Sequence, residues 1–121
     1  MIPKFRAWDK ELKMMCDVLK IDFGNRTLFY RHWLYGVSRE IDLSEVIVMQ
    51  STGLKDKNGV EIYEGDIVEN SHKEIGFIKK FSDAFCFNRQ ERNFYLSGIG
   101  AGSPFEVLGN IYENLELLEG D

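Results

Sequence analysis

The chain has 121 residues, enough for one ordinary domain or two very small ones, and 44% of its residues are hydrophobic. This composition excludes an intrinsically disordered, collagen-like or disulfide-scaffold protein, and no apolar run approaches the ~20 residues that span a bilayer. The net charge of −5 is uneven, with +2 over residues 1–60 and −7 over residues 61–121, so no overall field that attracts nucleic-acid phosphates is expected.

The N-terminal residues show neither the apolar segment nor the cleavage site of a secretory signal, so the sequence predicts a cytoplasmic protein without membrane association. Cys16 and Cys86 are the two cysteines. In a reducing cytosol they are expected to be buried free thiols, and a disulfide between them is the alternative.

The first half of the chain predicts strands. Residues 4–8 alternate polar and apolar types, and residues 14–23 and 27–33 flank Gly24-Asn25, which is typical of a two-residue hairpin turn. A helix over residues 10–19 competes with the second strand, but the hairpin turn favours the strand. One face of this strand is expected to carry Met15, Leu19, Ile21 and Phe23.

A short helical turn at residues 43–45 is expected to lead into a β-branched strand at residues 46–48. The polar stretch 51–59 then marks the boundary between two lobes. Beyond it, short strands are predicted at residues 66–70, 75–79, 84–87, 94–96 and 105–112, with a turn at Ser82-Asp83. A terminal helical turn over residues 113–118 would have Asn114 as its N-cap and Glu116 in its first turn.

These elements predict an all-β fold with minor helix. An N-terminal β-hairpin lobe, residues 1–50, would be followed by a small SH3-like β-barrel or sandwich lobe, residues 51–121. Gly53, Gly59 and Gly65 are interpreted as turn glycines. Residues expected in the core or at a lobe boundary are Trp8, Leu54, Tyr63, Ile67, Val68 and Tyr112.

Four sequence blocks, taken in order, resemble the YopX family, whose proteins are encoded by phages and prophages of bacteria. They are FRAWD at residues 5–9, MQSTGLKDKNG at 49–59, IYEGDIV at 62–68 and GNIYEN at 109–114. Leu115 departs from the family, which usually has a proline there. The resemblance implies one YopX-like domain across both lobes, a β-rich phage accessory protein in the bacterial host, and no catalytic residue.

The sequence contains no complete phosphate-binding, catalytic or metal-binding motif. The glycine-rich segment 98–103 lacks a following helix and is interpreted as a loop. His32 and His72 lie outside any recognisable catalytic motif, and with Cys16 and Cys86 they lack the short spacing of metal ligands. We therefore expect no enzyme activity, no metal site and no cofactor, and a small hydrolase or nuclease is the least favoured hypothesis.

The candidate interaction surface lies on the strand rich in aromatic residues and arginine. Period two places Phe29 and Arg31 on one face, with Trp33 and Tyr35 beyond them. Such a face suits single-stranded nucleic acid, but also a core or an oligomer interface, and the acidic chain favours the latter. We expect the strand to be covered on both sides, and the protein to be a homo-oligomeric, non-catalytic interaction module for a host or phage protein; nucleic-acid binding is the alternative. The candidate residues are Arg26, Phe29, Arg31, His32, Trp33, Tyr35 and Arg39.

Overall fold

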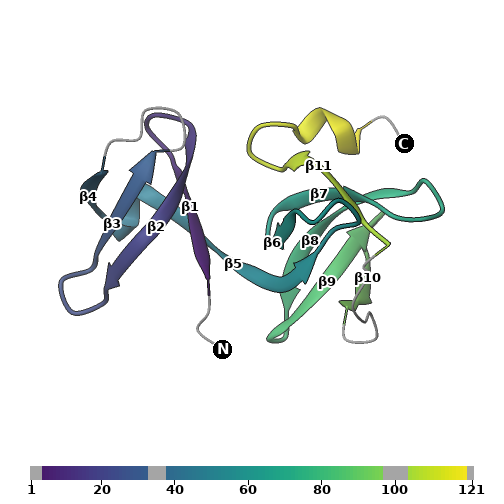
Figure 1. Cartoon of the computed structure of the whole chain (residues 1–121), viewed down its shortest axis with the longest axis horizontal. Coiled ribbons are helices and arrows are strands. Elements are labelled where there is room, and N and C mark those ends of the chain that lie inside the picture. The colour runs from purple at the N-terminus through teal and green to yellow at the C-terminus, as the bar shows by residue number, and fades with distance from the viewer. Residues whose placement is uncertain (1–3, 33–37, 97–103, 120–121) are drawn as a thin grey trace. The chain divides into compact units, whose positions relative to one another are not determined.

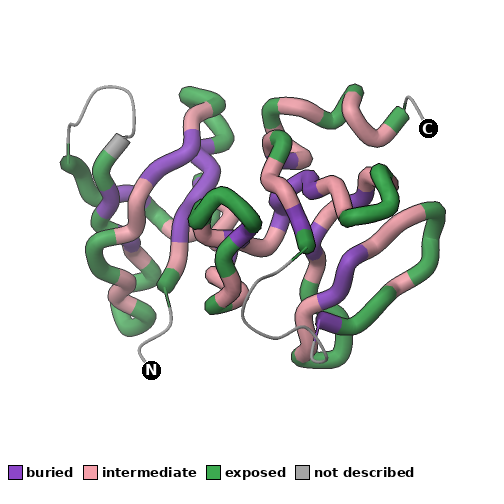
Figure 2. Tube along the Cα trace, turned by 45° about the vertical axis from the view of Figure 1, so that its right-hand side comes forward, coloured by how far each residue is buried: buried purple, intermediate pink, exposed green. Residues whose placement is uncertain are grey.

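The computed structural model describes residues 4–32, 38–96 and 104–119. The chain divides into two compact units, residues 1–50 and residues 51–121, and each is considered by itself (Figure 1). Most buried residues lie in strands, and most residues of the turns are exposed (Figure 2). The described residues are mostly in antiparallel strands, which confirms the all-β prediction.

The N-terminal unit is an antiparallel sheet in the order β4-β3-β2-β1-β5. The first part of β5 pairs with β1, and Asp42 caps a short 3-10 turn, η1, through its side chain. Ala7, Cys16, Leu28, Tyr30, Ile41 and Val46 form the core. The elements are β1 (Phe5–Asp9), β2 (Met14–Asp22), β3 (Thr27–His32), β4 (Ser38–Asp42), η1 (Leu43–Glu45) and β5 (Val46–Lys55).

The C-terminal unit begins where β5 continues to Lys55 and pairs with β6. Its larger sheet is antiparallel in the order β10-β9-β8-β7-β11, and a 3-10 turn, η3, follows β11. Ile62, Val68, Ile78, Phe87, Leu96 and Phe105 form the core. The elements are β6 (Glu61–Tyr63), β7 (Asp66–Glu69), β8 (Ile75–Phe81), β9 (Ala84–Arg89), β10 (Arg92–Tyr95), β11 (Glu106–Asn110) and η3 (Leu115–Leu118).

The turn between β2 and β3 differs from the predicted two-residue hairpin, because it spans residues 23–26. Arg26, rather than Gly24, adopts a left-handed backbone with φ of 56°. The carboxylate of Asp22 accepts hydrogen bonds from the backbone N–H and the side-chain amide of Asn25. The turn is therefore closed by the Asp22 side chain, and it does not depend on a left-handed glycine as the sequence pattern suggested.

The predicted apolar face of β2 is wrong at two members, since Leu19 is 50% exposed and Phe23, beyond the strand, is 77% exposed, whereas Ile21 packs against the core. The pairing of β2 with β3 shifts register between Val18 and Lys20, so Leu19 is the extra residue of a β-bulge. A bulge reverses the alternation of side chains, which a strict period of two cannot anticipate.

In the C-terminal unit the turn assignments of Gly59, Gly65 and Ser82-Asp83 are confirmed, whereas Gly53 lies within strand β5, where its pairing with β6 shifts register, and not in a turn. Gly53, Gly59 and Gly65 have φ of 81°, 85° and 88°, and Ser82 and Asp83 form a tight turn with φ of 52° and 64°. All five conformations are left-handed; glycine adopts them without steric penalty, whereas Ser82 and Asp83 adopt them at some cost.

Asn114 precedes η3 but does not cap it, contrary to the prediction. Its side-chain oxygen instead accepts a hydrogen bond from the backbone N–H of Asn110 at 3.1 Å. A Cβ on Gly109 would lie 2.3 Å from that oxygen, so glycine at this position makes room for the contact.

Candidate functional site

The candidate surface of the N-terminal unit alternates along β3. Leu28 and Tyr30 are fully buried, whereas Phe29 is 39% exposed and Arg31 is exposed. Within the N-terminal unit the outer face of the strand is therefore left uncovered. Trp33 and Tyr35 lie outside the described residues, and β3 ends at His32.

The cations of this surface lie beside carboxylates. Arg31 Nη2 is 3.6 Å from Asp17 Oδ2 on the neighbouring strand β2, where the two residues are paired in register. Phe29 is paired with Lys20 on one side and with Glu40 on the other. We call Asp17, Lys20, Phe29, Arg31 and Glu40 the β3 surface; it mixes both signs of charge around one aromatic ring.

Arg26 and Arg39, which the sequence grouped with this surface, are both exposed. Arg26 lies in the turn before β3, and its carbonyl accepts the backbone N–H of Leu43 at 2.9 Å. Arg39 lies on β4 in register with the buried Tyr30 rather than with Phe29 or Arg31. Arg39 therefore belongs to the other face of the sheet.

Beneath β3, the N-terminal core holds protonated side chains. The hydroxyl of Tyr30 donates a hydrogen bond to Asp9 Oδ2 at 2.8 Å, and burial followed by the Asp9 contact raises the pKa of Tyr30. Burial, with the charges of Asp9 and Asp17, raises the pKa of Cys16 to about 12. Both groups stay neutral near pH 7, which does not suit the activated nucleophile of covalent catalysis.

Cys16 and Cys86 are buried and are not joined in a disulfide. The prediction of two free thiols is confirmed. Since burial hides both sulfur atoms from solvent, reagents in solution reach them poorly in the folded state.

A pocket of about 610 Å³ in the C-terminal unit was not predicted from the sequence. It is formed by the turn between β7 and β8, by β9 and β10, and by residues on either side of segment 97–103. Its lining residues are Asn70, Ser71, His72, Glu74, Phe87, Arg89, Gln90, Arg92, Phe94, Tyr95, Leu96, Pro104 and Phe105.

Aromatic rings line one part of this pocket. Phe87 and Phe105 are each 4% exposed, and their ring centroids are 5.2 Å apart with an interplanar angle of 30°. Phe94 lies 6.4 Å from Phe87, between centroids, and is 52% exposed, as is Tyr95. Buried rings thus form an apolar base beside two rings that contact solvent.

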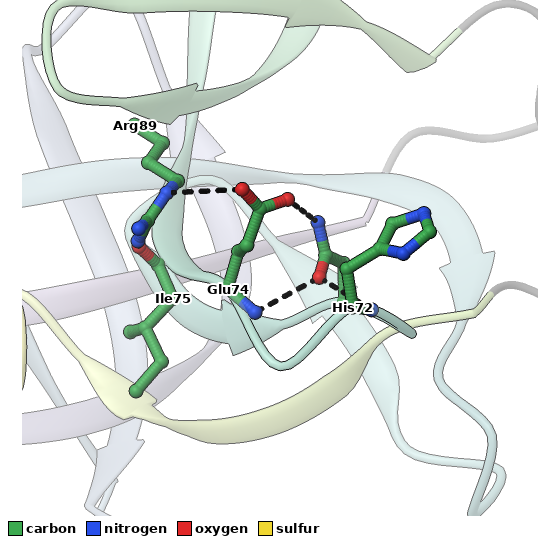
Figure 3. A network of polar contacts seen from close by, with 5 residues as sticks. His72, Glu74, Ile75 and Arg89 are labelled. Carbon is green, nitrogen blue, oxygen red and sulfur yellow. Dashed lines mark hydrogen bonds and ion pairs between the residues drawn. The ribbon is translucent and has the colours of Figure 1, made fainter.

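A polar network lines another part (Figure 3). Arg89 Nε lies 3.6 Å from Glu74 Oε2, and Arg89 Nη1 donates a hydrogen bond to the carbonyl of Ile75 at 2.9 Å. Asn70 donates its amide to Glu74 Oε1 at 3.0 Å and accepts the backbone N–H groups of His72 and Glu74. The Glu74 carboxylate is thus engaged on both oxygens.

His72 lies in the exposed turn that the sequence predicted, and its ring points away from Glu74 and Arg89 (Figure 3). General acid–base catalysis by this imidazole would need a carboxylate oriented toward the ring, and the Glu74 carboxylate is not so oriented. Over residues 4–32, 38–96 and 104–119, no group of three side chains is arranged to hold a metal ion. In the same residues, no helix has the length and apolar character to cross a membrane.

Sequence reasoning missed the pocket because its residues are dispersed from position 70 to position 105. The register of β9 and β10, which brings Arg89 opposite Arg92 and Phe87 opposite Phe94, is set by the tight turn at Gln90-Glu91. Neither residue of that turn is a glycine or asparagine, although both have positive φ, so the usual sign of such a turn is absent.

The comparisons with known proteins cover nearly the whole chain. A family model described as YopX protein matches residues 4–119. The crystal structure of protein EF1440 from Enterococcus faecalis is similar with 34% identity and a TM-score of 0.68, covering 98% of this chain and 99% of that one. The crystal structure of protein yopX from Bacillus subtilis has 17% identity and a TM-score of 0.58, covering 98% and 97%. No curated protein sequence matches the chain.

Proposed function

The chain belongs to the YopX protein family, and on that premise we propose that it is a non-catalytic accessory protein of a phage or prophage that acts by self-association. Its site of action would be the cytoplasm of the bacterial host. The strand order of the larger sheet supports an SH3-like C-terminal unit, since four consecutive strands form a meander and β11 returns beside β7. Because SH3-like barrels host many unrelated functions, the function is argued from the surface rather than from the fold.

One observation carries the proposal, namely that Phe29 is 39% exposed at the centre of the β3 surface. Aromatic residues and arginine are enriched in interfaces between proteins, and the β3 surface presents Phe29 and Arg31 together. Arg31 and Asp17 lie beside it with opposite charges, as do Lys20 and Glu40. A surface that carries both signs can meet a second copy of itself across a two-fold axis, each cation facing an anion.

The same charges disfavour the alternative, nucleic-acid binding. A strand that contacts phosphates needs cations whose charge is not already balanced, but Arg31 lies 3.6 Å from the Asp17 carboxylate. Phe29 is paired across β4 with Glu40, which would repel a phosphate backbone. Nucleic acid therefore remains the second candidate.

Three side chains of the kinds that act in catalysis are held in states that do not suit it. Cys16 and Tyr30 are buried and held neutral, and Glu74 is engaged by Arg89 and Asn70. None of these three is placed to act as a nucleophile or general base at pH 7.

The proposal is tested by sedimentation velocity over a wide range of protein concentration. The wild-type chain is expected to form a defined oligomer, and Phe29→Ser is expected to shift it toward monomer. Phe81→Ser is the matched control, because Phe81 is 47% exposed but lies in the C-terminal unit. A wild-type chain that stays monomeric at the highest concentration would overturn the proposal.

The alternative is tested in parallel with fluorescently labelled oligo(dT) at low ionic strength. We expect no binding. Binding that weakens with added salt and is lost in Arg31→Glu would establish the nucleic-acid function instead.

A further inference from the structure

We propose that the pocket of the C-terminal unit binds an extended peptide of another protein, which lies along the edge of β10, inserts a large apolar side chain beside Phe94, and directs an acidic group toward Arg92. This inference goes beyond self-association. It uses residues of the C-terminal unit, whereas the β3 surface belongs to the N-terminal unit.

The aromatic part of the pocket suits a large apolar side chain. Phe94 and Tyr95 are each 52% exposed, while Phe87 and Phe105 behind them are almost fully buried. A ring or branched aliphatic group that entered here would contact rings already held by the core, and would remove exposed aromatic surface from water. The volume of about 610 Å³ is that of a ligand site rather than of a packing defect.

The edge of β10 supplies the backbone contacts that an extended peptide needs. β10 is the last strand of its sheet in the described part of the chain, and it pairs with β9 on one side. The N–H and C=O groups on the outer side of an edge strand can form a ladder with an added strand. In this mode of recognition, backbone hydrogen bonds give affinity and an adjacent pocket gives side-chain specificity.

The charges around the pocket explain why an acidic group is preferred. Glu69 lies 3.8 Å from Lys73 and Glu74 lies 3.6 Å from Arg89, so these cations are already beside carboxylates. Arg92 is exposed and makes no ion pair with the residues that the structure describes. Arg92 also lies directly opposite Arg89 in the pairing of β10 with β9.

Two like charges directly opposite on neighbouring strands destabilise each other. Because Gln90 and Glu91 form the tight turn between them, the two arginines are kept in register. Glu74 already lies beside Arg89, and a carboxylate that bound at Arg92 would give the second arginine of the pair an acidic partner as well.

A nucleic acid fits this site less well. Phosphate backbones are held by several unbalanced cations, whereas of the two arginines in the described lining Arg89 lies beside Glu74 and Arg92 alone has no carboxylate partner. Residues 61–121 carry a net charge of −7, which repels a polyanion. A peptide with a single acidic side chain beside an apolar one needs only one cation, and it is repelled less by this negative charge than a polyanion is.

The experiment selects binders to the full chain from a phage-displayed library of random linear peptides. Enriched sequences are expected to place a large apolar residue close to Asp or Glu. Synthetic copies are then titrated into isotopically labelled protein, with shifts expected for amides at residues 70–74 and 89–95. Amides of β10 are expected to exchange more slowly with solvent when the peptide is bound, which side-chain contact alone would not produce.

Two variants test the residues directly. Arg92→Glu and Phe94→Ser are each expected to weaken binding by about tenfold or more, as loss of one central contact implies. Lys13→Glu and Phe81→Ser are the matched controls on exposed positions away from the pocket lining, and are expected to bind normally. Both substitutions at position 92 should leave the fold intact, since Arg92 is exposed and makes no ion pair with the described residues; Arg92→Gln is the second variant, which removes the charge without reversing it.

Three results would overturn the proposal. The first is a library selection that enriches no peptide, or enriches basic ones. The second is binding that Arg92→Glu and Phe94→Ser leave unchanged. The third is oligo(dT) binding at low salt that shifts the same amides, which would assign the pocket to nucleic acid. Loss of self-association in Phe29→Ser has no bearing on these outcomes, so the two proposals fail separately.

Discussion

Both units contain a buried aspartate at the end of a strand, Asp9 at the end of β1 and Asp56 directly after β5. In each, one carboxylate oxygen accepts two backbone N–H groups of the following turn. The other oxygen accepts a hydrogen bond from far along the chain. For Asp9 that donor is the hydroxyl of Tyr30, and for Asp56 it is the backbone N–H of Val107.

The difference lies in what each contact requires of the sequence. The Asp9 contact needs the hydroxyl of Tyr30 on β3, so a substitution of either Asp9 or Tyr30 removes it. The Asp56 contact ends on a backbone group, which any residue except proline at position 107 supplies. Asp56 therefore joins the turn 56–60 to β11 beside the contacts that Lys57 makes with Phe105 and Glu106, and the loss of Asp56 cannot be compensated by a change at its own partner.

The largest effect is expected from Asp56→Ala. It removes the acceptor of three partly buried backbone N–H groups, and each lost hydrogen bond to this charged group costs about 1–3 kcal/mol. We expect a loss of about 3 kcal/mol or more in the free energy of unfolding, measured by urea denaturation followed by far-UV circular dichroism. Glu116→Ala, at an exposed carboxylate, is the control and should change stability by less than about 0.5 kcal/mol.

Tryptophan fluorescence sharpens this measurement, because both tryptophans, Trp8 and Trp33, belong to residues 1–50. If the two units unfold independently, Asp56→Ala lowers the urea midpoint in circular dichroism and leaves the fluorescence midpoint in place. Coincident shifts in both would show that the units unfold as one, and an unchanged midpoint in both would contradict the structural role of Asp56.

Acid is expected to weaken the same contact. Burial alone raises the pKa of Asp56, but the N–H groups of Val107, Val60 and Asn58 and the charge of Lys57 outweigh it, so the pKa lies below its ordinary value. The folded state then binds this proton less readily than the unfolded state. Its contribution is fully present above the unfolded pKa of about 3.9 and is lost as the pH falls through the lower folded pKa.

The pH dependence is checked by urea denaturation at a series of pH values from neutral to strongly acidic, for the wild type and Asp56→Asn. The variant should lose less stability on acidification, because one group that must be protonated is gone. An identical slope in the two proteins would show that Asp56 does not contribute to acid sensitivity.

A smaller loss is expected from Tyr30→Phe, which removes one hydroxyl and keeps the ring in the core. The hydrogen bond to a buried carboxylate contributes about 2 kcal/mol. The fluorescence-detected urea midpoint should fall accordingly. Tyr95→Phe is the control, since Tyr95 is 52% exposed and its hydroxyl is open to water. Equal effects of the two substitutions would contradict a special role for the Asp9 contact.

The sequence predicted the parts of this molecule that depend on local pattern. Alternation along residues 28–31, the glycines with positive φ and the Ser82-Asp83 turn are local properties, and each reflects a steric rule. It failed at Leu19, because a bulge depends on how two strands meet rather than on either strand. It failed also at Asn114, whose side chain prefers the backbone of Asn110 to the turn that follows.

The pocket was beyond the same reasoning for a related reason. Phe87, Arg89 and Arg92 are ordinary strand residues in the sequence, and their grouping with Asn70 and Phe105 exists only after β7 to β11 have paired. Sequence patterns show which face a side chain takes within its own strand. They do not show which turn will lie across that face.

The smallest effect is expected for the ion pairs that distinguish the two candidate sites. Asp17 and Arg31 have half-exposed side chains, 48% and 53%, whereas Arg89 beside Glu74 is 19% exposed. Double-mutant cycles with alanine should give a coupling of about 0.3 kcal/mol for the first pair and about 1 kcal/mol for the second, the first disappearing in high salt. If the coupling is weak, Asp17 and Arg31 can separate and each can form an ion pair with the opposite charge on a second copy, as self-association requires. A coupling as large as that of the C-terminal pair would instead fix both side chains within one chain, and the β3 surface would have to associate through Phe29 without them.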